Sequence, residues 1–409
     1  MLLGAATRER RRPDFLVHRM KSTRPTARRS LLVAALLALP ALHAQADELF
    51  VLPDVMGDDV GNGELIYPNR PDLQRGDLDL VSVSAEQRKD GTWFIVEFAR
   101  PILSPEGRVT ELGQTPLEKL ARNGFFTFNV DIYVDTDRIA GAGLVETVPG
   151  RGVVIDRGYA WEKAIVLTPR PDIARTMLQM YFDDQFEAEV RAKKGRVSKG
   201  ELEEVEQQSE KRVEDLYFFP TRVRVSGRRI EFHVPEEFLG GVPKESWAYT
   251  VLVTGANIQQ VGSPIGLSSD RTPMMTMGVA RGITTSDWGI RGDVDAGVPP
   301  VIDLLASDPN TQPTVLDNYD TVAARLASVP GVAPDGNVAV SPTGQALTME
   351  QAARLDTTTG AAPAEAAAPA APEKRAVPAR LRTLNQLLAD GLITQAEYDD
   401  LRRKILAEL

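Results

Sequence analysis

Two groups of aspartates in this sequence could bind a hard metal ion. The first lies in DVMGDDVGNG (54–63), where Asp54, Asp58 and Asp59 stand among glycines. Ca²⁺ takes about six to eight oxygen ligands, and a glycine-bent loop can bring several carboxylates around it. Acidic residues dominate and no helix is expected to follow, which excludes a phosphate loop. The residues leave a plain Asp/Gly turn open as the alternative to a calcium loop.

The second group is Asp131, Asp135 and Asp137 in FFTFNVDIYVDTD (125–137). Alternate side chains of a strand face opposite sides, so Asp131 and Asp135 share the polar face of this predicted strand, and Asp137 follows its end. We predict that these three carboxylates are also metal ligands, with solvated strand-end carboxylates as the alternative. Whether one ion joins both groups depends on the fold.

A ligand surface could be built from aromatic and amide side chains. Of the four tryptophans, three stand inside or beside predicted strands and are expected in the core. Trp288 lies in a Gly/Asp-rich loop and is the better exposed candidate for stacking on a sugar ring. Tyr133 and Asn129 share the polar face of the strand described above, so we predict ligand binding by Trp288, Tyr133 and Asn129.

The residue types argue against catalysis. The chain has no cysteine, and His233 is the one histidine outside the first 46 residues. Thiol catalysis and zinc sites with several histidines are therefore excluded, and no nucleophile-elbow pattern surrounds a serine. Acid-rich loops alone do not define the paired carboxylates of a glycosidase. We predict that the protein is not an enzyme.

The first 46 residues have the parts of a secretory signal. Basic residues around Lys21 precede the apolar run Leu31–Leu39, and Ala44–Ala46 form a small-x-small cleavage site. The apolar run is too short to span a bilayer, and no later segment is apolar enough to do so. We expect a periplasmic or secreted protein, with Met20 left open as its true start.

Charge narrows the choice of partners. Residues 1–46 contain nine of the 47 Lys/Arg and two of the 57 Asp/Glu, so the remainder carries a net charge of −17. Such a charge disfavours nucleic acid and anionic lipid, and it suits divalent cations or neutral ligands such as sugars. We expect no nucleic-acid partner and no transmembrane segment.

The elements that must position these residues are short strands. Six β-rich runs recur between turn signals: TWFIVEF (92–98), FFTFNVDIYV (125–134), WEKAIVL (161–167), TRVRVSG (221–227), RIEFHV (229–234) and WAYTVLVTG (247–255). This pattern predicts a mainly β chain with an antiparallel β-sandwich over residues 47–308. Charged, helix-forming residues over about 172–217 predict a helical insertion, and a hairpin is one form that it could take.

The rest of the chain divides into two parts. Residues 309–379 are rich in Ala and Pro and are expected to be a disordered linker. Residues 380–409 carry an apolar stripe that Gly391 interrupts, which predicts a C-terminal helical hairpin. Two such short helices bury little apolar surface alone, so we expect self-association through 380–409.

The opening PDVMGDDVGNGELIYP, followed by LQRGDLDLVSVSAEQ, resembles the start of the glucodextranase C-terminal domain family. The resemblance implies a β-sandwich akin to DOMON domains and family-nine carbohydrate-binding modules, which are non-catalytic, often hold Ca²⁺ and bind carbohydrate or cell-surface material. The segment LNQLLADGLITQAEYDDLRRKIL (384–406) is similar to SHOCT, a short C-terminal helical hairpin linked to oligomerisation.

These observations favour a secreted binding module that Ca²⁺ stabilises and that recognises carbohydrate or cell-envelope material. The alternative is a structural or assembly protein of the envelope, which would act through protein–protein contacts and oligomerisation.

Overall fold

A computed structural model describes most of the chain beyond the leader. The described residues are 47–110, 114–258, 275–290, 297–320 and 325–336, with Leu388, Gln395, Tyr398, Asp399, Arg402 and Arg403 near the C-terminus. The predicted signal peptide and most of the predicted linker lie outside this part. These six described residues near the C-terminus are helical. The other residues of the predicted C-terminal hairpin lie outside the described part of the chain.

The first sheet is fully antiparallel. Its five strands, in spatial order, are β1 (Asp47–Pro53), β2 (Leu80–Arg88), β3 (Gly91–Phe98), β9 (Arg229–Val234) and β8 (Val223–Ser226). Burial alternates along β9, where Ile230 and Phe232 are buried while Arg229 is exposed. This alternation is expected of a sheet with one face on a core and the other in water.

The second sheet also has five strands. In spatial order they are β13 (Asp303–Leu304), β10 (Ala248–Gly255), β4 (Phe128–Asp135), β6 (Lys163–Leu167) and β7 (Tyr217–Phe218). All pairs are antiparallel except β6 with β7. The six predicted β-rich runs correspond to β3, β4, β6, β8, β9 and β10.

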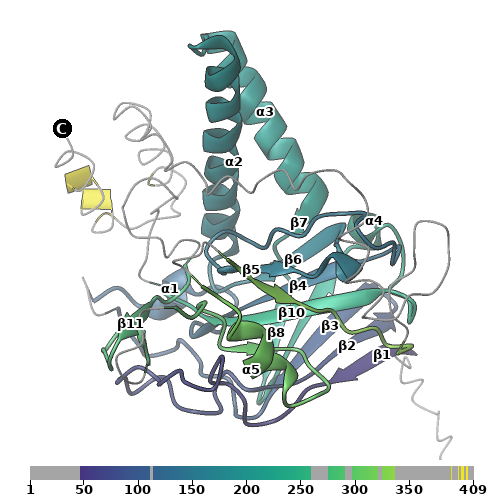
Figure 1. The fold of residues 1–409 in the computed structure, drawn as a ribbon. Helices are drawn as coiled ribbons and strands as arrows, with labels where there is room; N and C mark the ends of the chain where they lie inside the picture. The colour runs from purple at the N-terminus through teal and green to yellow at the C-terminus, as the bar shows by residue number, and fades with distance from the viewer. Residues whose placement is uncertain are drawn as a thin grey trace, which may run out of the picture. The chain divides into compact units, whose positions relative to one another are not determined.

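The two sheets pack face to face around one apolar core (Figure 1). Aromatic rings meet across the interface, with Phe50 of β1 4.5 Å from Tyr249 of β10 and Phe98 of β3 4.5 Å from Phe128 of β4 between ring centroids. Each fully buried aromatic ring stabilises the fold by about 1.5–3 kcal/mol through the hydrophobic effect. The predicted mainly β fold is confirmed.

A second apolar cluster covers the other face of the second sheet. It includes residues of β5 (Val153–Ile155), β14 (Ala327–Val329) and α5 (Thr311–Leu316), which pack against side chains such as Tyr133 and Ala164. Every residue of β4 is therefore buried. The polar face of this strand is covered, because the chain adds a layer that the strand's own sequence does not indicate.

This second layer also moves the predicted domain boundary. We expected a disordered linker from residue 309, but α5 and β14 lie beyond that point, and β14 pairs in parallel with β5. Val332 forms an isolated bridge with Tyr249 of β10. The folded domain thus extends to about residue 333 because these segments bury apolar side chains.

The predicted helical insertion is present as a hairpin of α2 (Pro171–Lys194) and α3 (Lys199–Leu216), which projects from the sheets (Figure 1). Gly195 ends α2 with a φ of 76°, a left-handed conformation that suits glycine. Ser198 and Glu201 form a capping box that starts α3.

The remaining elements are short. They are α1 (Leu117–Leu120), η1 (Arg157–Tyr159), α4 (Glu236–Leu239), and the parallel pair β11 (Val279–Arg281) and β12 (Trp288–Ile290). Among the described residues, no helix combines the length and the apolar character that crossing a membrane would need.

Candidate metal centre

The Asp/Gly loop begins directly after β1, and all three of its glycines have positive φ. Gly57 has a φ of 90° and Gly61 a φ of 60°. A Cβ atom on Gly61 would lie 2.6 Å from Cδ1 of Leu65 and 3.1 Å from the carbonyl oxygen of Val301, so this position has no room for a side chain. The Gly61 N–H donates to the carbonyl of Ile302 at 2.8 Å, which holds the loop against the chain next to β13.

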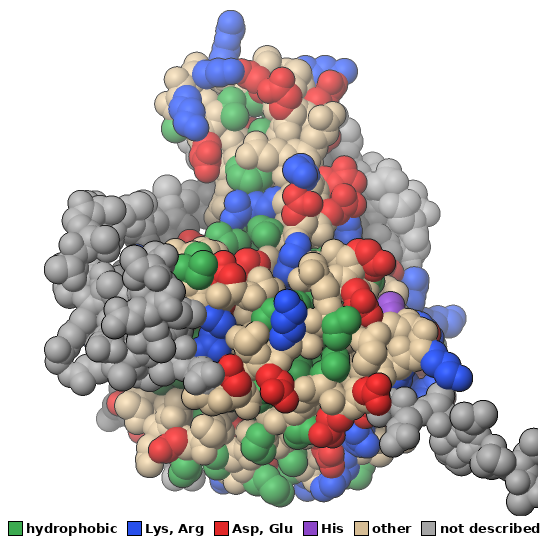
Figure 2. All heavy atoms as spheres, turned by 90° about the vertical axis from the view of Figure 1, so that its right-hand side faces the viewer, with side chains coloured by type: hydrophobic (Ala, Val, Ile, Leu, Met, Phe, Trp, Pro, Cys, Tyr) green, Lys and Arg blue, Asp and Glu red, His purple; other side chains and the backbone are tan. Residues whose placement is uncertain are grey.

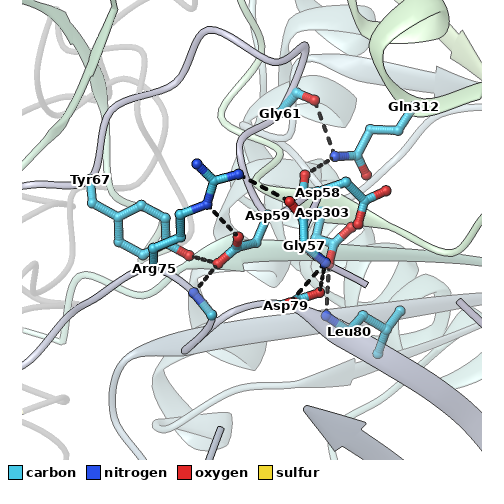
Figure 3. Close-up of polar contacts among 11 residues, drawn as sticks. Gly57, Asp58, Asp59, Gly61, Tyr67, Arg75, Asp79, Leu80, Asp303 and Gln312 are labelled. Atoms are coloured by element: carbon cyan, nitrogen blue, oxygen red, sulfur yellow. Dashed lines mark hydrogen bonds and ion pairs between the residues drawn. The ribbon is translucent and has the colours of Figure 1, made fainter. Parts of the chain in front are cut away.

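Three carboxylates meet beneath this loop. One carboxylate oxygen each from Asp54, Asp58 and Asp303 lies within 4.8 Å of the others. Asp54 follows β1 of the first sheet, whereas Asp303 begins β13 of the second, so the cluster joins the two sheets. Figure 3 shows Asp58 and Asp303 beside one another.

Several of these oxygens have no protein partner. Both carboxylate oxygens of Asp58 and Oδ2 of Asp54 are shielded from solvent and accept no hydrogen bond within the described structure. Asp54 Oδ1 accepts from the Ala306 N–H at 2.7 Å, and Asp303 accepts from the N–H groups of Leu80 and Leu304 at 2.7 and 2.8 Å. The main chain thus orients Asp54 and Asp303, while the Asp58 carboxylate is left to bind something else.

Burial and like charge raise the pKa values of all three groups. Burial is the main cause in each case; it raises the pKa of Asp54 to about 8, with the charges of Asp58 and Asp79 adding to the effect. The pKa of Asp58 rises to about 6, and that of Asp303 rises well above its ordinary range. None of these three acids forms an ion pair with a described basic side chain, so the cluster is a candidate site for a positive ion.

Two further side chains support the loop. Gln312, which is fully buried, accepts from the Leu304 N–H at 2.7 Å and donates to the carbonyls of Gly61, at 3.1 Å, and Asp58 (Figure 3). Both carboxylate oxygens of Asp79 accept from the Gly57 N–H at 2.9 Å. These contacts hold the loop main chain, and with it the direction of the Asp58 side chain.

Asp59 is not part of the three-carboxylate cluster, although we predicted it as a ligand. Its side chain is fully buried and accepts from the hydroxyl of Tyr67 and from the Gly76 N–H, the latter at 2.6 Å. The Nε atom of Arg75 lies 3.8 Å from the other oxygen. Asp59 therefore ties the Asp/Gly loop to the residues that lead into β2.

Asp131 requires a similar correction. Its carboxylate lies in the second apolar cluster and binds the guanidinium of Arg151 at 2.5 and 3.1 Å, with both side chains 1% exposed. Arg151 Nη1 also donates to Oγ1 of Thr276 at 2.5 Å. A buried arginine takes the place that we assigned to a metal ion.

Asp135 and Asp137 do lie together, and Glu162 joins them within 4.8 Å. Burial, followed by the charge of Glu162, raises the pKa of Asp135 to about 7. However, Arg138 donates its N–H to Asp135 Oδ1 at 2.6 Å, and its Nε lies 3.7 Å from Oδ2. A cation side chain at this second group makes it a weaker metal site than the first.

One ion cannot join both groups. Val253 of β10 pairs with Asp303 on one side and with Val130 on the other. Asp135 lies five residues beyond Val130 along β4, which corresponds to about 16 Å. The two acidic groups are therefore separate.

The predicted ligand residues are all buried. Trp288 is 0% exposed and packs against Tyr67, with 4.1 Å between ring centroids, so the expected exposure of Trp288 was wrong. The Tyr133 hydroxyl accepts from the Val148 N–H at 2.8 Å, and the Asn129 amide donates to Thr254 at 3.2 Å. None of the three presents a surface for a sugar. The burial predicted for the other tryptophans is confirmed.

Two family models match the chain. Residues 49–331 match the family described as the C-terminal binding module, SLH-like, of glucodextranase, and residues 379–406 match SHOCT, the short C-terminal domain. The comparison with curated proteins gives no match. The first match spans the sandwich except the first two residues of β1, and it includes the helical hairpin and the three-carboxylate cluster. The chain therefore belongs to the family of SLH-like C-terminal binding modules of glucodextranase and carries a SHOCT segment at its C-terminal end.

Proposed function

We propose that this protein is a secreted, non-catalytic module that binds carbohydrate of the cell envelope and is stabilised by Ca²⁺. The family assignment carries the binding function, because it covers residues 49–331 and describes a binding module. The signal-like sequence before Asp47 supports export. The absence of cysteine gives such an exported domain no disulfides, so a bound cation would be a useful source of stability.

The calcium part of the proposal rests on the cluster of Asp54, Asp58 and Asp303. Calcium would bind the free oxygens of Asp58 and Asp54 together with Asp303, and it would replace the protons that the raised pKa values keep on this cluster. Oxygen ligands only, with no nitrogen or sulfur donor among them, suit a hard cation. Because the cluster draws on both sheets, the ion would fasten one end of the sandwich.

A glycan array tests the binding function. We expect the mature chain to bind carbohydrate of the envelope in calcium and to bind it less in excess EDTA, since the ion orders the sandwich. An array without any signal in calcium, combined with a reproducible protein partner from a periplasmic pull-down, would refute carbohydrate binding.

That second result would support an envelope assembly protein. The feature that favours this alternative is the α2–α3 hairpin, which projects from the sheets, together with the SHOCT match at residues 379–406. Under either function we propose that the C-terminal segment mediates self-association.

A further inference from the structure

The outer face of the first sheet carries a group of arginines. Ile230 and Phe232 of β9 lie in the sandwich core, so Arg229 and Glu231 point to the opposite face. Arg224 of β8 pairs directly with Glu231 and therefore shares that face. Within the run TRVRVSGRR (221–229), all four arginines are exposed. In Figure 2, blue basic side chains lie beside the purple histidine of β9.

Acidic neighbours hold part of this group in place. Four ion pairs are present among the described residues of this face: Arg88 with Glu231 (2.9 Å) and with Glu86 (2.8 Å), Arg228 with Glu97 (2.7 Å), and Arg222 with Asp90. Among the described residues, these pairs leave other arginines of the face without an acidic partner.

Trp93 of β3 positions two of the arginines. The guanidinium carbons of Arg88 and Arg222 each lie 4.8 Å from its ring centroid, and His233 meets the ring edge-on at 5.9 Å. The ring is only 5% exposed, so it offers no stacking surface to a sugar. Its Nε1 donates at 3.0 Å to Asp90, which also binds Arg222. The tryptophan thus presents guanidinium groups at the surface.

Arg224 and Arg229 are the two cations left over. Their guanidinium groups form no ion pair or hydrogen bond with any described residue, although Glu231 and Glu97 stand directly opposite them in the sheet. As diagonal neighbours on adjacent strands, they are about 7–8 Å apart at the main chain. Two free guanidinium groups at this spacing can each bind an anionic group of one extended polymer.

We propose that this outer face, through Arg224 and Arg229, binds an anionic polysaccharide, one that carries carboxylate, sulfate or phosphate groups. The inference rests on the proposed function, which supplies carbohydrate as the ligand class. The negative net charge does not prevent it, because charges farther away than about 8 Å are screened at physiological salt. Edge strands often carry charged residues that prevent pairing with another chain, and this explains Arg224 on the edge strand β8. It does not explain Arg229, which lies on the inner strand β9.

The test compares dextran sulfate with neutral dextran of the same length, in calcium, by titration of the mature chain. We expect dextran sulfate alone to bind. The double variant Arg224→Ser/Arg229→Ser should bind dextran sulfate about tenfold more weakly. The steepness of the plot of log affinity against log salt concentration should also fall by about two. The matched control is Arg196→Ser with Lys199→Ser, which removes the same charge from two exposed positions, one between α2 and α3 and one at the first residue of α3.

Three results would overturn the inference. The first is unchanged binding of dextran sulfate by the Arg224/Arg229 variant, and the second is an equal loss of affinity in this variant and in the control. The third is binding of polyglutamate as tight as that of dextran sulfate, which would indicate that any acidic polymer binds. Binding of neutral dextran or of neutral array glycans without dextran sulfate would also refute it, yet would leave the proposed function standing. If the double variant does not fold, the two single variants provide the same comparison.

Discussion

Replacing Asp303 with Asn should abolish the calcium dependence of stability. Asp303 is fully buried, and its two oxygens accept from Leu80 and Leu304 at 2.7 and 2.8 Å. An asparagine keeps the size of the side chain but removes one of the three carboxyl groups that could bind calcium as carboxylates, the others being Asp54 and Asp58. Its NH₂ group can accept from neither N–H, so one of the two hydrogen bonds is lost. Because the Leu304 N–H keeps Gln312 as an acceptor, this loss costs only about 0.5–1.5 kcal/mol with or without metal.

The size of the calcium effect follows from linkage. A ligand present at about 100 times its dissociation constant stabilises the native state by about 2.7 kcal/mol when it binds only that state. For a domain of this size, that corresponds to a rise of about 4–5 °C in melting temperature. We expect this rise in the natural sequence and almost none in the Asp303→Asn variant.

The stabilisation of the fold by calcium should also depend on pH. The pKa values of Asp54, about 8, and Asp58, about 6, exceed the ordinary value of 3.8. Without metal, the folded protein holds more protons than the unfolded chain between about pH 4 and 8, so its stability falls as pH rises through this window. Calcium must displace those protons, so its stabilising effect grows over the same window. The melting-temperature shift should be small at pH 5 and largest at pH 8.5.

Calorimetry of the mature chain in calcium and in EDTA, at both pH values, measures these shifts. Taking the difference between calcium and EDTA within each variant cancels the general loss of stability that the substitution causes. Glu64→Gln is the matched control, because Glu64 is an exposed acid directly after the Asp/Gly loop and outside the cluster. The reasoning is refuted if the Asp303→Asn variant keeps the full shift, if Glu64→Gln loses it, or if the shift does not change with pH.

Three further changes give separate tests. Asp131→Asn leaves the buried Arg151 without its counter-charge and should reduce the free energy of unfolding by about 3–5 kcal/mol in urea titrations, whereas a loss below 1 kcal/mol would contradict the ion pair. Gly61→Ala strains a backbone with positive φ and meets Leu65, so we expect a loss of about 1–3 kcal/mol and weaker calcium binding by calorimetry; an unchanged midpoint would count against the loop geometry. Deletion of 380–409 should lower the oligomeric state, and an unchanged mass by light scattering would refute self-association.

The sequence predicted part of the three-carboxylate cluster. Asp54 and Asp58 stand in one glycine-rich loop, so their types and spacing indicated a cation site locally. Asp303 was not predicted as a ligand because it is far from Asp54 and Asp58 in the sequence. A single acid within the apolar run VIDLLA was the one local feature that could have indicated it. Asp59 stands next to Asp58 but bonds to Tyr67 and Gly76, and loop composition does not show which way a carboxylate turns.

The strand β4 shows the same limit. Alternation along 125–135 predicted the strand and its polar face, since period-two patterning is a local property. Whether that face meets water depends on β5, β14 and α5, which cover it from other parts of the chain. The burial of Asp131 and Tyr133 follows from that covering layer, and so does the need for Arg151 as a buried partner.

The sequence by itself thus determined the strands, the capped helical hairpin and the Asp/Gly loop, because neighbours along the chain decide turns, caps and alternation. Only the tertiary structure decided that Asp303 completes the cluster, that Trp288 is buried, and that Arg224 and Arg229 stand together on an open face. The physical reason is that burial and charge pairing depend on segments brought together by folding, and a local pattern does not specify which distant segment will cover it.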